Sequence, residues 1–398
     1  MKIKLDLSVV IFLLIAAILG TFTLSYMGFS GNWVALRSST TNNLSKLDEA
    51  INIIDERFIG DIDTEEIVDG AISGMVNSLE DRWSYYITSD EYAEYMMNIR
   101  NQYAGVGIVI EKKDGIDGII INSVNKNGPA FHAGIMPESV ITHVGDTDIT
   151  QMAFRDASEL MSEHISAGKL VLTVTDKEGV SSVFTLIPGL IEIDPVSSKM
   201  VEDNIGLITI KNFDQKSAEQ LIAAADELLG KGAKGLIFDV RFNPGGQLSE
   251  LLKILDYLLP EGTIFMSHEK GKPVVSETSD ANCLRVPMAV LINKDSYSAA
   301  EFFAAALQEY NWATIIGEKT TGKGYAQITV KLSDGSAIHI SSSEYFTPKG
   351  ASLKDIGIAP DIEVLLTDEQ LTDLYYGRLQ DKDDDQLMSA IDDIRKQN

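Results

Sequence analysis

The sequence predicts a multidomain α/β protein. At 398 residues the chain is long enough for two or three domains, and its 44% hydrophobic and 23% charged residues are typical of a globular protein. An uncharged apolar stretch near the N-terminus, a middle segment of short strands, and a later alternation of apolar strands with helices predict this class. We expect five parts, over residues 1–36, 37–102, 103–188, 189–366 and 367–398.

Charge and cysteine content exclude several functions. The formal net charge of −26 argues against a nucleic-acid partner, because phosphate binding needs clustered Lys and Arg. The single cysteine, Cys283, excludes an internal disulfide framework, and no Cys/His spacing indicates a zinc site. We therefore expect neither a metal nor an organic cofactor.

Residues 1–36 have the pattern of a transmembrane anchor. No charged side chain occurs from Leu7 to Leu36, and roughly 20 apolar residues are enough to span a bilayer as a helix. Lys2 and Lys4 precede this stretch, which favours a cytoplasmic N-terminus. We expect a single-pass protein of the cell membrane whose remaining chain lies on the extracytoplasmic side. A cleaved signal peptide is the alternative.

Residues 37–102 are predicted to be helical. Apolar residues recur at helical spacing in two runs, one made of Leu44, Leu47, Ile51 and Ile54, the other of Ile67, Ala71, Met75 and Leu79. Residues 63–66 supply an acidic cap for the second run. Such amphipathic helices can pack on the body of the protein or form the arm of a homodimer, and the sequence leaves both open.

Residues 103–188 are predicted to form a compact β-rich module. A Glu178-Gly179 turn joins its last two strands into a hairpin. The expected strands are 105–110, 118–124, 140–144, 170–176 and 182–187, and the expected short helices are 129–133 and 154–165.

Residues 189–366 show apolar strands that alternate with helices, which is typical of an α/β core with buried strands. The expected strands are 205–210, 235–240, 288–293 and 314–317, and the expected helices are 217–229, 248–259 and 298–310. Residues 367–398 are acidic and predicted to be helical. Within them, the run from Asp381 to Asp385 is most simply a solvated stretch of charge.

Ser298 is the first candidate for chemistry. It stands where the apolar run 287–293 gives way to a helix, and Ser298-x-x-Glu301 is also a capping box, which by itself only starts a helix. The two interpretations are compatible, because a serine at a helix N-terminus lies near unpaired N–H groups and the positive end of the dipole. The N–H of Ala299 could then stabilise negative charge on a substrate oxygen.

A second such donor is expected in the turn Asp239-Val-Arg-Phe-Asn-Pro-Gly-Gly246. A buried strand ends there, and Gly245 and Gly246 carry N–H groups that no side chain obstructs. An ordinary strand-to-helix turn would explain the same residues.

Lys323 is the candidate base for Ser298, since burial can lower the pKa of a lysine toward neutrality. Gln327 lies four residues on, where its amide could hold the lysine in place. Residues 317–324 also fit most of a phosphate-binding loop. However, Gly324 stands where that motif needs Ser or Thr, and a strand follows instead of a helix. A solvated loop lysine is the simplest alternative.

Taken together, these segments resemble the carboxyl-terminal processing peptidases, the S41 family of serine proteases, from about Leu44 to Val364. The resemblance rests on segments 71–79, 85–86, 105–110, 128–135, 239–246, 296–308, 322–327, 347–350 and 357–361, of which the first two resemble the family's N-terminal helical segment. It implies a PDZ domain within residues 103–188. It also implies an α/β serine protease core of the crotonase-like (ClpP/crotonase) type within residues 189–366.

The resemblance also implies roles for particular residues. The catalytic positions that it matches are Ser298 as nucleophile, Lys323 as general base, Gln327 as the residue that orients the base, and Gly246 and Ala299 as oxyanion donors. The carboxylate-binding loop of the PDZ domain matches Gly105, Val106, Gly107 and Ile108, where exposed N–H groups could receive a peptide carboxylate.

These features together predict a membrane-anchored serine endopeptidase. Its partners would be protein or peptide substrates whose free C-terminal tails enter the PDZ domain. The alternative is a non-catalytic PDZ scaffold at the cell surface that captures protein tails without cleaving them.

Overall fold

The computed structural model describes residues 44–397, which divide by their internal contacts into one unit that ends at Met75 and another that begins at Val76. The predicted transmembrane segment, residues 1–36, lies outside the described residues. Within residues 44–397, no helix is both long enough and apolar enough to cross a membrane.

Two amphipathic helices open the described chain, over residues 44–57 and in α2 (Thr64–Asn77), as the spacing of apolar residues predicts. The carboxylate of Asp63 accepts the N–H groups of Glu65 and Glu66, so the expected cap forms. Apolar side chains of this region stay exposed, among them Leu44, Leu47, Ile54 and Met75.

The helical prediction for residues 37–102 is wrong at one point, because strand β1 (Tyr85–Ile87) lies between α2 and α3 (Ser89–Ile99). β1 pairs antiparallel with β18 (Ala337–Phe346), with Tyr86 opposite Ile338. A strand of three residues has no detectable period of its own. Its conformation depends on a partner some 250 residues away in sequence, which local patterning cannot reveal.

The β-rich module contains a sheet in the order β3-β4-β5-β7-β8, with the short β6 (Thr147–Asp148) paired to β5. Inward side chains such as Ile119, Ile121 and Leu172 are fully buried and make a core of their own. Its remaining elements are β2 (Gln102–Gly105), β3 (Ile108–Glu111), β4 (Ile119–Val124), α4 (Pro129–His132), β5 (Val140–Val144), α5 (Phe154–Ser166), β7 (Leu170–Thr175) and β8 (Ser181–Leu186).

The single strand expected over residues 105–110 is two strands. β2 pairs antiparallel with β9 (Gly189–Glu192), whereas β3 pairs with β4. Between them Gly107 adopts φ 85°, a left-handed conformation that breaks the ladder and that glycine adopts without strain.

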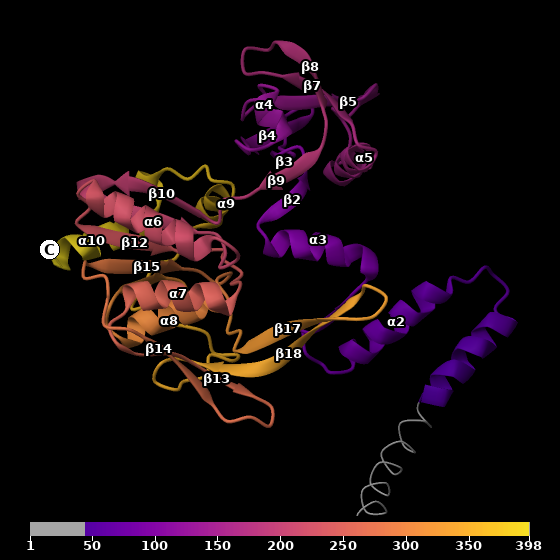
Figure 1. Ribbon diagram of the computed structural model, residues 1–398. Helices are drawn as coiled ribbons and strands as arrows, with labels where there is room; N and C mark the ends of the chain where they lie inside the picture. The colour runs from indigo at the N-terminus through magenta and orange to yellow at the C-terminus, as the bar shows by residue number, and fades with distance from the viewer. Residues whose placement is uncertain (1–43, 398) are drawn as a thin grey trace, which may run out of the picture. The chain divides into compact units, whose positions relative to one another are not determined.

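A six-stranded sheet in the order β10-β11-β12-β15-β16-β19 forms the α/β core, parallel except for β10 (Figure 1). Alternate residues of β12 face opposite sides: Leu236 and Phe238 pack with the helices α6, α7 and α8, and Ile237 packs with α10. The bounds are β10 (Val196–Val201), β11 (Ile205–Ile210), α6 (Ser217–Gly230), β12 (Gly235–Asp239), α7 (Leu248–Leu258), β15 (Met288–Ile292), α8 (Ala299–Glu309), β16 (Thr314–Gly317) and β19 (Ile362–Glu363).

A second sheet lies beside this core and carries one wall of the candidate site. Its strands β17 (Tyr325–Lys331), β13 (Gly262–Glu269) and β14 (Val275–Ser279) join β1 and β18. β17 and β18 pair from Tyr325 to Lys331, and Phe265 and Tyr345 connect this sheet to α8 through ring contacts with Phe302.

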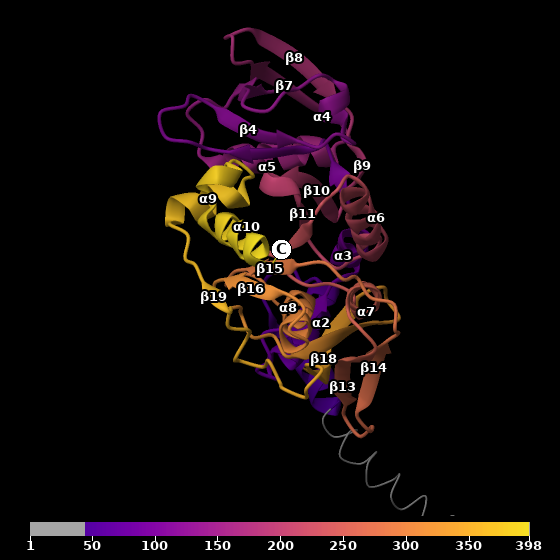
Figure 2. The same cartoon turned by 90° about the vertical axis from the view of Figure 1, so that its left-hand side faces the viewer.

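The C-terminal segment packs on the core and contains α9 (Asp368–Tyr375) and α10 (Asp385–Gln397), drawn in yellow in Figure 2. The prediction of a solvated charge run at residues 381–385 is wrong for Asp384, which is 3% exposed. Both carboxylate oxygens of Asp384 accept hydrogen bonds from the buried guanidinium of Arg241. The acidic composition of the run predicted that Asp384 would be exposed to solvent. Its burial is tolerable because it pairs with a cationic residue that is distant in sequence.

Candidate functional site

One cavity of about 570 Å³ brings together all five residues that the sequence singles out for catalysis. They come from three separate segments: the turn after β12, the start of α8, and the turn before β17 together with the first residues of that strand. The residues that line it include Gly246, Ser298, Ala299, Lys323 and Gln327.

Ser298 immediately precedes α8 and adopts an unusual backbone conformation, with φ 58° and ψ −123°. This region costs a non-glycine residue free energy and persists where the surroundings enforce it. The surroundings here are tight, because a Cβ atom added to Gly245 would lie 2.8 Å from the Cβ of Ser298. A glycine at position 245 therefore allows the turn after β12 to approach the serine.

The two proposed oxyanion donors have N–H groups without a protein acceptor. Within residues 44–397, no described hydrogen bond is donated by the N–H of Gly246 or of Ala299. The turn is fixed on either side of Gly246, since Phe213 N–H donates to Gly245 O at 2.7 Å and Gln247 N–H donates to Phe213 O at 2.8 Å. Two free N–H groups beside a serine, one of them at a helix N-terminus, can stabilise an oxyanion.

Glu301 connects the serine to the lysine turn, a role that local sequence did not reveal. Its side chain is 0% exposed, and Oε2 accepts the N–H groups of Ser298 at 2.9 Å and Lys323 at 2.8 Å. Oε1 accepts the hydroxyl of Thr320 at 2.5 Å and the N–H of Gly322 at 2.7 Å. The predicted capping contact to Ser298 is thus present, and the same carboxylate also holds the turn around Lys323.

The Lys323 side chain lies on an aromatic surface. Its Nζ is 4.4 Å from the ring centroid of Trp83 and 5.7 Å from that of Tyr297. Burial lowers the pKa of Lys323 to about 8, against the opposing charges of Asp81 and Glu301. No hydrogen bond described for residues 44–397 joins Lys323 Nζ to Ser298 Oγ.

Trp83 belongs to a segment that the sequence analysis did not connect with the site. Asp81 accepts the N–H of Trp83 at 3.2 Å and the hydroxyl of Ser84 at 2.5 Å, and Ser84 Oγ accepts the N–H of Ser341 on β18. These bonds hold the residues before β1 against β18 and so place the indole under the lysine. In the sequence, the only indication that this segment contributes to the site is a single tryptophan next to two charged residues.

Gln327 lines the cavity, and no hydrogen bond described for residues 44–397 joins it to the lysine head group. Its Nε2 donates to Tyr325 O at 3.1 Å and to Ser341 Oγ at 3.0 Å. Its role in orienting Lys323 therefore stays a prediction. The phosphate-loop alternative for this segment is excluded, because β17 begins at Tyr325 where that motif requires a helix.

The same cavity has an apolar part beside Ser298. The side chains that form it are aliphatic or aromatic: Leu248, Leu251, Phe302, Ala326 and Tyr345. Burial raises the pKa of Tyr345 to about 12, so this part of the cavity carries no charge near neutral pH. It can accept an apolar side chain of a bound peptide.

A buried ion-pair network supports the turn that carries Gly246. Arg241, 7% exposed, donates to Asp239 Oδ1 through Nε at 2.9 Å and to Asp384 through both terminal nitrogens, at 3.0 and 2.8 Å. Gln386 Oε1 accepts a further bond at 3.0 Å. The start of the oxyanion turn is thereby attached to the C-terminal segment.

The predicted peptide-binding loop lies in the β-rich module. Val106 O accepts the N–H of Ala130 and Gly107 O that of Asn125, which fixes the loop. The N–H groups of Val106 and Gly107 donate no backbone hydrogen bond described for residues 44–397. β3, which begins at Ile108, is an edge strand with β4 as its partner, and a peptide could extend the sheet there. Gly105 ends β2 and is buried.

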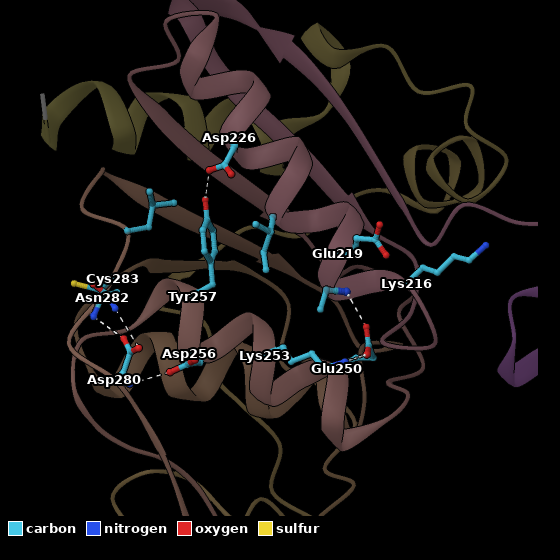
Figure 3. Close-up of a pocket in the computed structure, with 13 residues that line it drawn as sticks. Lys216, Glu219, Asp226, Glu250, Lys253, Asp256, Tyr257, Asp280, Asn282 and Cys283 are labelled. Atoms are coloured by element: carbon cyan, nitrogen blue, oxygen red, sulfur yellow. Dashed lines mark hydrogen bonds and ion pairs between the residues drawn. The ribbon is translucent and has the colours of Figure 1, made fainter.

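A larger cavity, of about 750 Å³, lies between α6 and α7 and contains none of the predicted catalytic residues (Figure 3). Two of its acidic groups are paired within its own wall: Tyr257 donates to Asp226 at 2.8 Å, and Lys253 Nζ lies 2.6 Å from Glu250. It offers no serine with a neighbouring base, and we assign the chemistry to the smaller cavity.

Sequence models of three protein families match parts of this chain. The sequence model of peptidase family S41 matches residues 204–364, that of the PDZ domain matches 95–175, and that of the activating protease CtpB N-terminal domain matches 32–91. The carboxy-terminal processing protease CtpA of Bacillus subtilis is 30% identical over 370 residues, which cover 92% of this chain and 78% of the relative.

A second relative and a solved structure are also similar to this chain. A protein of Staphylococcus aureus named "Probable CtpA-like serine protease" is 29% identical over 83% of this chain and 66% of the relative. The solved structure of the photosystem II D1 C-terminal processing protease has a TM-score of 0.51 at 24% identity, over 86% of this chain and 97% of that one. The structural likeness supports the fold.

Proposed function

The chain belongs to the S41 family of serine-type peptidases, and from this premise we propose that it cleaves peptide bonds with a Ser298–Lys323 dyad. The observation that carries this proposal is the shared cavity of Ser298, Lys323 and the two unpaired N–H groups of Gly246 and Ala299. A binding module would have no use for a strained serine, a partly desolvated lysine and open N–H groups in one place.

In the proposed mechanism, neutral Lys323 takes the proton of Ser298 as the hydroxyl attacks the scissile carbonyl. The N–H groups of Gly246 and Ala299 stabilise the oxyanion, and protonated Lys323 then supplies a proton to the leaving amine. Water, activated by the lysine, releases the acyl group from Ser298. Each step returns the lysine to the protonation state that the next step needs.

We propose that Lys323 reaches Ser298 by side-chain motion alone. Glu301 fixes the backbone of both residues, while four methylene groups separate the lysine Cα from Nζ. Rotation from the Trp83 ring toward Ser298 would replace a cation–π contact with a hydrogen bond to the hydroxyl. A neutral amine makes no cation–π interaction and therefore loses little free energy when it leaves the ring. The rotation of Lys323 is thus easiest when the lysine is neutral, which is the state that can accept the serine proton.

We further propose that the PDZ domain receives the free carboxylate of a substrate tail. The N–H groups of Val106 and Gly107 would bind the carboxylate, and the open edge of β3 would pair with the tail. Gln327 would orient the lysine once its side chain has rotated from the Trp83 ring toward Ser298. These roles assign to each predicted residue a function that its position allows.

Location and assembly complete the proposal. Residues 1–36 would anchor the protein in the cell membrane with the peptidase on the extracytoplasmic side. The exposed apolar residues of the first two helices, such as Leu44 and Met75, would form the contact of a homodimer. Sedimentation of the full chain with and without Leu44→Glu tests the second point: a monomeric wild type, or an unaltered dimer, would contradict it.

Cleavage of a flexible protein with an apolar C-terminal tail tests the proposed function. Wild-type protein should release the tail, whereas Ser298→Ala and Lys323→Ala should reduce kcat by a factor of about 10³ or more. Undiminished cleavage by either variant would contradict the dyad. Tail binding by the wild type without cleavage would instead support the non-catalytic scaffold.

A further inference from the structure

A carboxyl group that the proposed mechanism does not use borders the cavity of Ser298. Asp214 lies in the turn between β11 and α6 and lines the same cavity as Ser298 and Gly246. Its neighbour Phe213 is bonded through N–H to Gly245 and through C=O to Gln247. This pairing places Asp214 directly beside the oxyanion turn.

Asp214 has no cationic partner within residues 44–397: none of the described ion pairs includes it. Lys323 borders the same cavity, but the carboxylates that act on it are Asp81 and Glu301. An acidic group that is partly buried in a catalytic cavity and unpaired is a candidate for contact with a ligand.

The groups packed around Asp214 do not neutralise it. Glu250 on α7 is itself satisfied, since Oε2 accepts the N–H of Ala218 at 3.0 Å and Oε1 lies 2.6 Å from Lys253 Nζ (Figure 3). The Gln247 amide donates a hydrogen bond to Asp214 but carries no positive charge. On α3, the hydroxyl of Tyr95 is hydrogen-bonded to Thr329.

Burial raises the pKa of Asp214 to about 6, against the Gln247 hydrogen bond and together with the negative charge of Glu250. Asp214 is therefore ionised above pH 6 but insufficiently solvated. A cationic group of a bound ligand would stabilise the ionised Asp214 carboxylate in place of the missing solvent.

We propose that Asp214 selects substrates that carry a lysine or arginine side chain close to the scissile bond. A substrate ammonium or guanidinium group would pair with the Asp214 carboxylate while a neighbouring apolar residue fills the pocket lined by Leu248, Leu251 and Phe302. The inference rests on the proposed peptidase function and adds to it a preference for one class of side chain.

The test uses a panel of peptides with an apolar tail and a single lysine moved through the positions on both sides of the scissile bond. Each lysine peptide is matched by one with norleucine, which has the same length and no charge. At pH 8 the wild-type full chain should cleave the lysine peptide with a kcat/KM about tenfold higher at one position. Equal values at every position would overturn the proposal.

The variant Asp214→Asn should reduce that lysine-to-norleucine ratio to about one. Glu219→Gln, which changes an exposed acid of α6 five residues further on, should keep the wild-type ratio. The wild-type ratio should also fall below pH 6, where Asp214 takes up a proton and the substrate lysine does not. A ratio that survives Asp214→Asn, or one independent of pH between 5 and 8, would overturn the assignment.

Binding separates this inference from the proposed function. In a Ser298→Ala background, the favoured lysine peptide should bind about tenfold more tightly than its norleucine match, and Asp214→Asn should remove the difference. Equal cleavage of both peptide types would refute the Asp214 assignment and leave the peptidase intact. Absence of cleavage of all peptides, with equal binding of both types, would refute both.

Discussion

Glu301 Oε2 accepts the backbone N–H of Lys323 at 2.8 Å, so a carboxylate on the helix that follows the proposed nucleophile fixes the turn of the proposed base. The same oxygen accepts the N–H of Ser298. The backbones of the proposed nucleophile and the proposed base are therefore held by one buried side chain.

Glu301→Gln should disrupt this arrangement while keeping side-chain volume. The amide has one acceptor oxygen, and its NH₂ group would face donors that the carboxylate now accepts, leaving buried N–H groups unsatisfied. We expect kcat to fall about 100-fold and the free energy of unfolding to fall by about 2 kcal/mol or more. Steady-state kinetics and urea denaturation measure both effects.

Glu309→Gln is the matched control, because Glu309 ends the same helix and accepts hydrogen bonds from Thr347 and Lys349 without contacting Ser298 or Lys323. It should leave kcat within about twofold. An unchanged kcat in Glu301→Gln, or equal losses in both variants, would contradict the role assigned to Glu301.

Gly246→Ala should weaken oxyanion stabilisation. Gly246 has φ 147°, and an added Cβ atom would lie 2.7 Å from Phe213 O and 2.8 Å from Phe213 Cα, so the turn would have to move. We expect kcat to fall about 100-fold with a smaller change in KM. Gly230→Ala, which meets no atom within 4 Å, serves as control and should keep wild-type kinetics.

Asp384→Asn should destabilise the protein, because it leaves the buried charge of Arg241 compensated by Asp239 alone. The expected loss in the free energy of unfolding is about 3 kcal/mol. Asp381→Asn, which removes an exposed pair with Lys199, should cost less than about 1 kcal/mol. Equal and small losses in urea denaturation would show that the C-terminal segment does not support the oxyanion turn.

Gly107→Ala should impair tail binding by the PDZ domain. Its φ of 85° disfavours a side chain, and the new Cβ atom would lie 3.0 Å from the Cα of Gly128. We expect at least about tenfold weaker binding of a tail peptide with a free carboxylate, measured by fluorescence anisotropy. Gly115→Ala, at a similar φ of 79° but with nothing within 4 Å, controls for backbone strain. An amidated peptide that binds as tightly as the free acid would contradict the proposed loop.

Local sequence predicted the elements whose signal is local. Strands 140–144, 205–210 and 314–317 have the predicted bounds, and the five catalytic positions implied by the family resemblance line one cavity. Period and turn chemistry determine such elements largely by themselves.

Contacts distant in sequence were not predictable in the same way. β1 is a strand because it pairs with β18. Asp384 can be buried because the distant residue Arg241 donates hydrogen bonds to its carboxylate. Trp83 lies under Lys323 only once β1 is in place. Glu301 showed its helix-capping pattern in the sequence, but its bonds to the Lys323 turn depend on the fold.

The pH dependence of Ser298 phosphonylation by a small serine-reactive phosphonate tests the central claim most directly, since it needs neither the PDZ domain nor a natural substrate. Burial places the pKa of Lys323 at about 8, so the base is protonated below this pH and neutral above it. The account predicts that the wild-type phosphonylation rate rises through about pH 8. In Lys323→Ala the rate should be at least about 100-fold lower and lack this rise. A wild-type rate that is flat across pH 8, or a Lys323→Ala variant with the wild-type profile, would contradict it.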